Sequence, residues 1–189
     1  MTWKLLDQTV VHDGWGRFLL LKVEVAKGVV VERQLDDHGS AACVLPYDPE
    51  RRTALLARLP RVGPLFMSLD PRLTEAPAGM LDPAESGQDC ARREAMEELG
   101  VRLDALESVA RAWSAPGVST ETIDLYLAPY SRADRVGQGG GVEGEHESIE
   151  AIEVDLDDLW GQALRGTIAD MKTLLLVYAL YARHPELFA

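Results

Sequence analysis

The chain contains little cysteine, few basic residues and no long apolar run, and each shortage excludes a class of protein. Its two cysteines, Cys43 and Cys90, are too few for a disulfide framework and are not spaced as zinc ligands, so we expect both thiols to be buried. The 19 Lys and Arg residues stand against 31 Asp and Glu residues, and the net charge of −12 would repel the phosphate backbone of a nucleic acid. We therefore expect no nucleic-acid partner, whereas divalent cations are favoured.

No segment has the length and apolarity of a membrane span. The most apolar stretch, residues 174–180, is much shorter than the ~20 residues that cross a bilayer. Residues 1–20 carry Asp7, His12 and Asp13 instead of the apolar run of a secretory signal. We therefore predict a cytoplasmic protein with no membrane partner. With 189 residues, 47% of them apolar, the chain is long enough for one domain with a full hydrophobic core.

The order of apolar runs predicts a mixed α/β domain. Runs rich in β-branched residues and separated by turn residues predict antiparallel strands at 18–25, 29–35, 41–45 and 53–59, with further strands at 106–113, 123–128 and 149–154. Helices are expected at 86–99, 157–164 and 170–182, whereas residues 61–77, with three prolines and a glycine, are expected to form an irregular loop. We divide the chain into an N-terminal strand region, residues 1–38, and a main domain, residues 39–189.

Residues 79–101, which read GMLDPAESGQDCARREAMEELGV, are the most informative segment of the chain. The pattern consists of a glycine, five spacers, a glutamate, seven spacers, Arg-Glu, two spacers, Glu-Glu, one spacer and Gly-Val. Ser86 is placed to cap a helix, with the carboxylate of Asp89 as an acceptor for the amide of the cap. Gly100 is placed to end that helix in the left-handed conformation.

Three glutamates share one face of this predicted helix. Because successive helical residues turn by about 100°, Glu94, Glu97 and Glu98 fall within roughly a quarter of the circumference. Like charges at this spacing cost roughly 0.2–0.5 kcal/mol per pair, a cost that a bound cation would remove. Oxygen ligands point to a hard ion such as Mg²⁺ or Mn²⁺ and to a substrate that carries a diphosphate. The alternative is a solvated acidic face; the opposite side is a small apolar stripe suited to packing on a sheet, namely Cys90, Ala91, Ala95 and Leu99.

The segment resembles the signature of the Nudix hydrolases, with Ala95 in place of a bulky aliphatic residue. The resemblance implies an α/β/α sandwich with a mixed β-sheet and, with Mg²⁺ or Mn²⁺, hydrolysis of a nucleoside diphosphate linked to another group. Arg93 is placed to pair with a neighbouring carboxylate and to orient it. The implied metal ligands are the carbonyl of Ala78 and the carboxylates of Glu94, Glu98, Glu97 and Glu85, and the implied catalytic residues of this segment are Glu98, Glu97 and Arg93.

The downstream sequence resembles the nucleoside diphosphate-sugar branch of that family, which includes enzymes for ADP-ribose and GDP-mannose. Pro116 lies 15 residues after Val101, although Ala115 replaces the serine that usually precedes it. Residues 139–154, GGGVEGEHESIEAIEV, are similar to a glycine-rich acidic loop that closes over the diphosphate. The resemblance makes Glu145 the general base and Glu147 a metal ligand, with the opposite assignment open. By composition alone the glycine-rich piece would be a flexible surface loop.

The same resemblance implies residues that bind the substrate. Arg61 and Lys172 correspond to cations that bind the diphosphate or sugar, although Met171 stands where the pattern has a glycine. Glu121 corresponds to an acid that binds sugar hydroxyls, and Arg33 to the nucleobase pocket. Enzymes of this branch are homodimers that exchange N-terminal strands, so Trp3, Trp15 and Phe18 are candidates for the contact between subunits, or they cover the edge of their own sheet.

Two other functions stay open at this point. The chain could be a nucleotide-sugar sensor without catalysis, although such a sensor has little need of every carboxylate and of Arg93. It could also be a Nudix enzyme for a nucleoside triphosphate or a dinucleoside polyphosphate. The choice between adenine and guanine is equally open, because it depends on a few hydrogen bonds in a pocket that the sequence does not locate.

Overall fold

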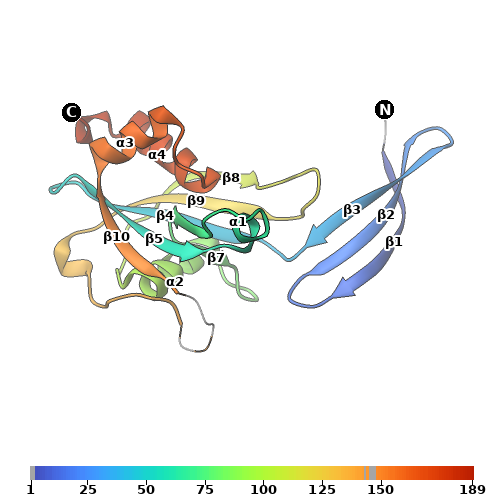
Figure 1. Cartoon of the computed structure of the whole chain (residues 1–189), viewed down its shortest axis with the longest axis horizontal. Helices are drawn as coiled ribbons and strands as arrows, with labels where there is room; N and C mark the ends of the chain where they lie inside the picture. The colour runs from blue at the N-terminus through green and yellow to red at the C-terminus, as the bar shows by residue number, and fades with distance from the viewer. Residues whose placement is uncertain (1–2, 143, 145–147) are drawn as a thin grey trace. The chain divides into compact units, whose positions relative to one another are not determined.

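The structure, a computed structural model, describes residues 3–142, 144 and 148–189 (Figure 1). The chain divides into two compact units. One unit combines Met1–Ala41 with Arg111–Ile123, and the other combines Ala42–Ala110 with Asp124–Ala189. None of the helices among the described residues is long and apolar enough to cross a membrane.

The first unit contains a three-stranded antiparallel sheet in the order β1-β2-β3. β2 (Arg17–Ala26) and β3 (Val29–Asp37) agree with the predicted strands, and Gly28 supplies the positive φ of 76° at the turn between them. β1 (Lys4–Asp13) was not predicted. All ten of its residues are exposed and its sequence shows no alternation of apolar and polar positions, so it carries no periodic signal.

The second unit is built on a sheet with the strand order β10-β5-β4-β9-β8, in which β6 also pairs with β5 and β7 with β4. β5 runs antiparallel to β4, β6 and β10. The predicted strands in this region are confirmed within two residues at each end, except that β4 continues three residues further. The strands are β4 (Ala41–Asp48), β5 (Thr53–Pro60), β6 (Arg72–Glu75), β7 (Ala78–Met80), β8 (Glu107–Trp113), β9 (Thr122–Pro129) and β10 (Glu150–Asp155).

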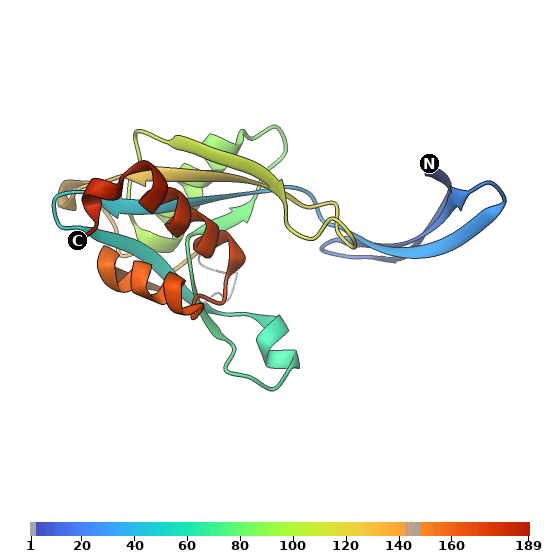
Figure 2. The same cartoon turned by 90° about the horizontal axis from the view of Figure 1, so that it is seen from above.

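Helices cover both faces of this sheet. Figure 1 shows α2 (Gly87–Leu99) on one face and α3 (Leu156–Arg165) with α4 (Met171–Arg183) on the other, and Figure 2 shows the α3–α4 side from above. The predicted α/β/α sandwich with a mixed sheet is therefore confirmed. Short 3₁₀ turns at Arg132–Asp134 and Pro185–Leu187 were not predicted.

The prediction of an irregular loop at residues 61–77 was wrong in part. The structure has a short helix, α1 (Val62–Phe66), followed by β6 (Arg72–Glu75), whose residues pair antiparallel with the end of β5. Figure 2 shows α1 at the end of this β5–β6 hairpin. Three prolines in 17 residues conceal the strand in the sequence, because β6 lies between two of them and is only four residues long.

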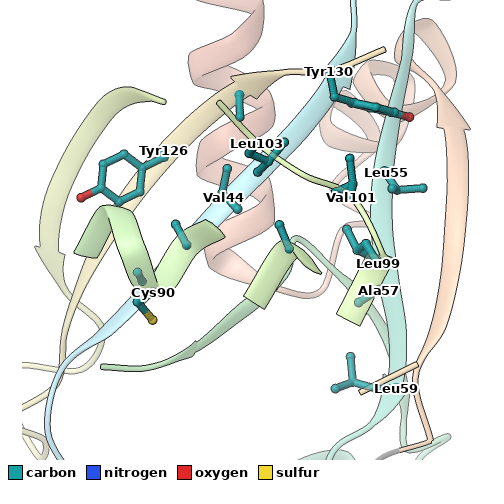
Figure 3. Close-up of a cluster of buried hydrophobic side chains, with 14 residues drawn as sticks. Val44, Leu55, Ala57, Leu59, Cys90, Leu99, Val101, Leu103, Tyr126 and Tyr130 are labelled. Carbon is teal, nitrogen blue, oxygen red and sulfur yellow. The ribbon is translucent and has the colours of Figure 1, made fainter. Parts of the chain in front are cut away.

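The small apolar stripe of α2 packs on the sheet as predicted (Figure 3). Cys90 and Leu99 on α2 are fully buried against Val44 and Leu55 of the sheet. Both cysteine thiols of the chain are buried, as expected. Because alanine and cysteine are short, α2 approaches the strands closely, and its opposite face, which carries the glutamates, is held in a fixed orientation.

Candidate functional site

The two ends of α2 are fixed by the residues predicted for them. The side chain of Ser86 accepts a hydrogen bond from the Asp89 amide at 3.2 Å, and Gly100 ends the helix with φ = 65°. One detail was wrong: the Asp89 carboxylate accepts from the Ser86 hydroxyl at 2.6 Å. These ends determine which residues of α2 face the site.

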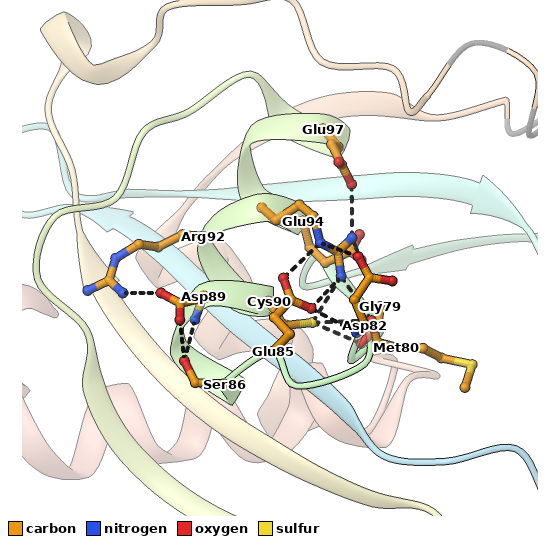
Figure 4. Close-up of polar contacts among 11 residues, drawn as sticks. Gly79, Met80, Asp82, Glu85, Ser86, Asp89, Cys90, Arg92, Glu94 and Glu97 are labelled. Atoms are coloured by element: carbon orange, nitrogen blue, oxygen red, sulfur yellow. Dashed lines mark hydrogen bonds and ion pairs between the residues drawn. The ribbon is translucent and has the colours of Figure 1, made fainter.

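Arg93 joins three of the predicted carboxylates. Its Nε and Nη2 donate to both oxygens of Glu85 at 3.0 Å, and its Nη1 donates to Glu94 at 2.6 Å and to Glu97 at 3.1 Å. A further bond at 2.9 Å runs from Nη2 to the carbonyl of Met80. Figure 4 shows Glu85, Glu94 and Glu97 turned towards this network. The predicted pairing of Arg93 with a neighbouring carboxylate thus extends to three of them.

The same contacts change the acidity of the groups. Hydrogen bonds from Arg93 lower the pKa of Glu85, against the effect of partial burial. Hydrogen bonds to Glu85 and the charge of Glu94 raise the pKa of Arg93. Glu85 is therefore ionised at neutral pH and holds the guanidinium that orients the other two carboxylates.

Gly79 leaves room for Glu94. A Cβ atom on Gly79 would lie 1.8 Å from Oε1 of Glu94, a distance that no side chain can adopt. The absence of a side chain therefore allows the carboxylate to lie against the backbone of β7, which begins at Ala78. This contact brings the predicted carbonyl ligand and a predicted carboxylate ligand into one region.

The donor set suits a hard divalent cation. Glu94 and Glu98 are 9% and 5% exposed, and buried carboxylates on one helix need positive charge nearby. Among the described residues no three acidic, histidine or cysteine side chains are arranged to hold a metal ion as they stand, and Glu85, Glu94 and Glu97 each accept a hydrogen bond from Arg93. The chemistry of the oxygens fits a metal ion, and Arg93 is the internal cation that balances them.

Cys90 lies behind this network. Its thiol lies 3.4 Å from the carbonyl of Gly79 and 3.5 Å from that of Met80, and Arg93 Nη2 is 3.4 Å from the sulfur. Burial raises the pKa of Cys90 to about 12, so the thiol stays protonated. The residue packs and holds the loop before α2, as expected for an unreactive thiol.

A second polar cluster joins the two predicted phosphate-binding cations. Arg61 donates through Nε and Nη2 to the two oxygens of Glu75 at 3.0 and 2.9 Å. Nζ of Lys172 lies 3.4 Å from Glu75 and 2.6 Å from Asp170. The sequence indicated the cations, whereas both carboxylates were missed. Asp170 had a detectable signal, because it precedes α4 as its N-cap.

This cluster lies close to the end of the carboxylate helix. Burial by itself would lower the pKa of Arg61, but the hydrogen bonds and charge of Glu75, together with the charges of Glu98 and Asp170, raise it. Lys172 behaves likewise: burial opposes its charge, and Asp170 and Glu75 raise its pKa. The two cations are therefore charged, and Arg61 lies close enough to Glu98 to respond to its charge.

The glycine-rich segment is attached to the C-terminal end of α2. The amides of Gly140 and Gly141 donate to the carbonyls of Glu98 and Glu97, each at 3.0 Å, and Gly137 donates to Gly100 at 3.0 Å. These bonds satisfy carbonyls that a helix end leaves without partners. The composition of residues 137–141 thus serves a defined contact. Glu145 and Glu147, predicted as base and ligand, lie outside the described residues.

Two predicted substrate-binding residues belong to the other compact unit. The side chain of Glu121 faces His38, with 3.6 Å between Oε1 and Nε2, and His38 also bonds to Asp36 at 2.8 Å. The indole of Trp15 stacks on His38 with ring centroids 5.1 Å apart. Arg33 is on exposed β3 and donates to the carbonyl of its neighbour Glu32.

A family model described as NUDIX domain matches residues 37–175 of the chain. The chain is 39% identical over 153 residues to the GDP-mannose pyrophosphatase of Cronobacter sakazakii, and this alignment covers 80% of this chain and 78% of that protein. It is 35% identical over 152 residues to the protein of the same name from Citrobacter koseri, with the same coverage. The match to an Escherichia coli GDP-mannose pyrophosphatase has 34% identity over 154 residues and covers 81% and 79% of the two chains.

A solved structure described as an ADP compounds hydrolase has the same fold. The two structures align with a TM-score of 0.76 over 97% of each chain, at 16% sequence identity. At this identity the likeness supports the fold, while the curated relatives provide the comparison of sequences.

Proposed function

Because this chain belongs to the Nudix family, we propose that it hydrolyses the diphosphate bond of a nucleoside diphosphate sugar, with GDP-mannose as the first substrate to test. Water attacks one phosphorus of the diphosphate, and the products are a nucleoside monophosphate and a sugar phosphate. The chain is a Nudix pyrophosphohydrolase, and its relatives are named for GDP-mannose.

The observation that carries this proposal is the complete network on α2. Glu85, Glu94 and Glu97 contact Arg93, while Gly79 is shaped to accept Glu94. A protein that only binds nucleotide sugars would not require this number of carboxylates around one guanidinium. The network therefore favours the enzyme over the silent sensor.

The carboxylates define where a cofactor would bind. We assign the metal ligands to Glu94 and Glu98, with the carbonyl of Ala78, and the ion to Mg²⁺ or Mn²⁺. When bound, such an ion polarises the phosphoryl oxygens and offsets the charge of the leaving phosphate. Glu97, in the same network, is assigned as a further metal ligand, and Glu85 accepts hydrogen bonds from Arg93. Arg93 keeps the carboxylates oriented.

Three cations and an acid bind the substrate in this proposal. Arg61 and Lys172 face the diphosphate in this proposal, since both are charged and share the partner Glu75, and Glu98 acts on Arg61. Glu121 accepts hydrogen bonds from sugar hydroxyls, and Arg33 takes part in recognition of the base. Glu145 is proposed as the general base and Glu147 as a metal ligand; for these two the sequence is the support.

We also propose that the enzyme acts as a homodimer. Every residue of β1 is exposed, and Trp3 and Trp15 are 61% and 80% exposed. Such side chains are costly in water and suit a contact with a second subunit. Phe18 is only partly exposed and packs within its own unit in part. Light scattering of the intact chain, compared with a chain from which residues 1–38 are removed, tests this: the intact chain should have twice the monomer mass.

A substrate panel tests the function itself. The purified protein is incubated in Mg²⁺ with GDP-mannose, ADP-ribose, a dinucleoside polyphosphate and a nucleoside triphosphate, and products are separated by chromatography. We expect mannose 1-phosphate and GMP to be the dominant products, because the curated relatives carry the GDP-mannose name. Cleavage of only the triphosphate or the polyphosphate would assign the chain to another Nudix activity. Binding of a nucleotide sugar without cleavage of any substrate would favour the alternative function, a sensor without catalysis.

A further inference from the structure

Glu75 is a buried carboxylate shared by two cations. Its side chain is only 4% exposed, and it bonds to Arg61 through both of its oxygens. Lys172 lies 3.4 Å from one of the same oxygens. A buried carboxylate is stable only if it is paired, so these contacts fix Glu75 and the groups around it as one unit.

The backbone around Glu75 is rigid. Glu75 ends β6, where it pairs with Ala57 of β5. The next amide, that of Ala76, donates at 2.7 Å to the hydroxyl of Thr173, which in turn bonds at 2.6 Å to the N-cap Asp170 of α4. Glu75 is thus held between a sheet strand and the first turn of α4.

Arg61 has a less constrained position. It follows β5 and precedes α1, where Val62 and Phe66 are 82% and 88% exposed. Its backbone amide donates to the carbonyl of Pro71 at 2.8 Å, which closes the β5–β6 hairpin but does not set the direction of the side chain. Within the described part of the chain, the guanidinium of Arg61 donates its side-chain hydrogen bonds to Glu75. The direction of the guanidinium therefore depends on that carboxylate.

We propose that Glu75 is a positioning residue that directs Arg61 towards the diphosphate of the substrate. The carboxylate takes the edge of the guanidinium formed by Nε and Nη2. A guanidinium has five N–H donors in a fixed plane, so the edge that carries Nη1 stays available for a phosphoryl oxygen. This inference rests on the proposed function, because it takes Arg61 as a group that binds the diphosphate.

The charge of Glu75 separates positioning from simple attraction. A carboxylate beside two cations lowers the positive potential of the site, so it weakens the attraction of any anion. If Glu75 only weakened the attraction of the anionic substrate, replacement of Glu75 by glutamine would lower KM and leave kcat unchanged. A positioning role gives a different result, since a released Arg61 binds the phosphate in unproductive directions and kcat falls.

The test is a double-mutant cycle of Glu75→Gln and Arg61→Ala, with kcat and KM for the hydrolysed nucleotide sugar. We expect Glu75→Gln to lower kcat by about 10²-fold without raising KM. In the Arg61→Ala background the same change should lower kcat by less than about threefold, since there is no guanidinium to direct. Equal losses in both backgrounds, or no loss in the first, would overturn the proposal.

Two controls separate positioning from a general loss of charge and from misfolding. Glu150→Gln removes a negative charge from β10, at an exposed position where Oε2 of Glu150 lies 3.8 Å from Nη1 of Arg58. This variant should leave kcat unchanged. If Glu75→Gln fails to fold, Glu75→Asp replaces it in the cycle, because it keeps the charge but shortens the reach to Arg61, and the same coupling is expected.

The failure of the proposed function is visible separately. A wild-type protein that cleaves no nucleotide sugar refutes the function before any variant is made. In that case the Nε–H resonance of Arg61 in a ¹⁵N spectrum still tests the positioning: it should be protected from exchange in the wild type and lose protection in Glu75→Gln. Equal protection in both proteins would overturn the inference.

Discussion

One guanidinium, that of Arg93, decides the arrangement of the glutamates around it. It bonds to Glu85 through two nitrogens and to Glu94 and Glu97 through the third. Glu98 on the same helix face is the most buried of the helix glutamates, at 5% exposure, and its charge acts on Arg61. Chemically identical side chains thus differ in their surroundings, since three of them share Arg93 and the charge of Glu98 acts on Arg61.

Glu98→Gln should abolish most of the activity. The change keeps the shape of the side chain but removes the charge of a proposed metal ligand, so we expect kcat to fall by about 10²–10³-fold or more at saturating Mg²⁺. The circular dichroism spectrum should be unchanged. Glu50→Gln, at an exposed position, is the matched control and should be fully active. A loss of kcat below about tenfold, equal to ~1.4 kcal/mol of activation barrier, would show that Glu98 is not a metal ligand.

Gly79→Ala should damage the site through Glu94. The added methyl group would need the space that Oε1 of Glu94 occupies at 1.8 Å, so the carboxylate must move. We expect kcat to fall by about 10²-fold, since a displacement of about 1 Å has that effect on a positioned group. Gly63→Ala is the control, because no atom lies within 4 Å of its added methyl group, and it should retain full activity. Equal activities of the two variants would show that Glu94 is not a ligand.

At the scale of elements, the contact between α2 and the glycine-rich segment links two regions that lie far apart in the sequence. The segment donates three backbone hydrogen bonds to Glu97, Glu98 and Gly100, at the end of the helix. Gly139 is pressed against this end as well, since a Cβ there would lie 2.2 Å from the carbonyl of Glu98. Residues 137–141 are therefore fixed at the C-terminal end of α2.

Gly100→Ala and Gly166→Ala form a matched pair that measures this contact. Both glycines end helices with a positive φ, 65° and 68°, so alanine brings the same backbone strain of about 1–2 kcal/mol. Only at Gly100 would the methyl group also meet the backbone of Gly137, at 2.4 Å. We expect Gly166→Ala to lower Tm by roughly 2–6 °C and to keep kcat. Gly100→Ala should lower both Tm further and kcat; indistinguishable variants would mean that the contact does not matter.

At the scale of the whole molecule, the excess of acid makes stability depend on how each carboxylate is paired. The net charge is −12, and several partly buried acids keep their charge because a cation lies beside them. Arg93 lowers the pKa of Glu85. For Asp170, burial would raise the pKa, but the charge of Lys172 and the hydrogen bonds from Lys172 and Thr173 outweigh burial, so the pKa is lowered overall. A carboxyl group whose pKa is lower in the folded state stabilises the fold above its unfolded pKa and loses this effect as pH falls through the folded pKa.

The pH dependence of Glu85→Gln follows from this sign. The Tm of the wild type should exceed that of the variant by its full margin above about pH 5, where Glu85 is ionised in both folded and unfolded chains. This difference in Tm should shrink as pH falls below about 4, because the carboxyl group of Glu85 is then protonated and no longer carries the negative charge that attracts Arg93. Thermal melts from pH 7 to pH 3 in EDTA measure it, with Glu50→Gln as control. A margin that is constant over this range would contradict the assignment.

The sequence by itself determined the class of protein and the centre of its candidate site. The spacing from Gly79 to Val101 placed the glutamates on one face of α2, and the fold class followed from the order of elements, because helix geometry and apolar periodicity are local properties. Ser86 and Gly100 were found for the same reason. β1, β6 and β7 were missed, since β1 is fully exposed and the short strands β6 and β7 depend on pairing with β5 and β4.

Only the tertiary structure decided which residues meet. Glu75 and Lys172 are 97 residues apart in the chain, and Gly140 reaches the carbonyl of Glu98 across 42 residues. No local pattern records such contacts, because they depend on how strands and helices pack after they have formed. The cluster of glutamates on α2 could thus be predicted from spacing, whereas the buried acid that contacts Arg61 became visible only when β6 and α4 were brought together.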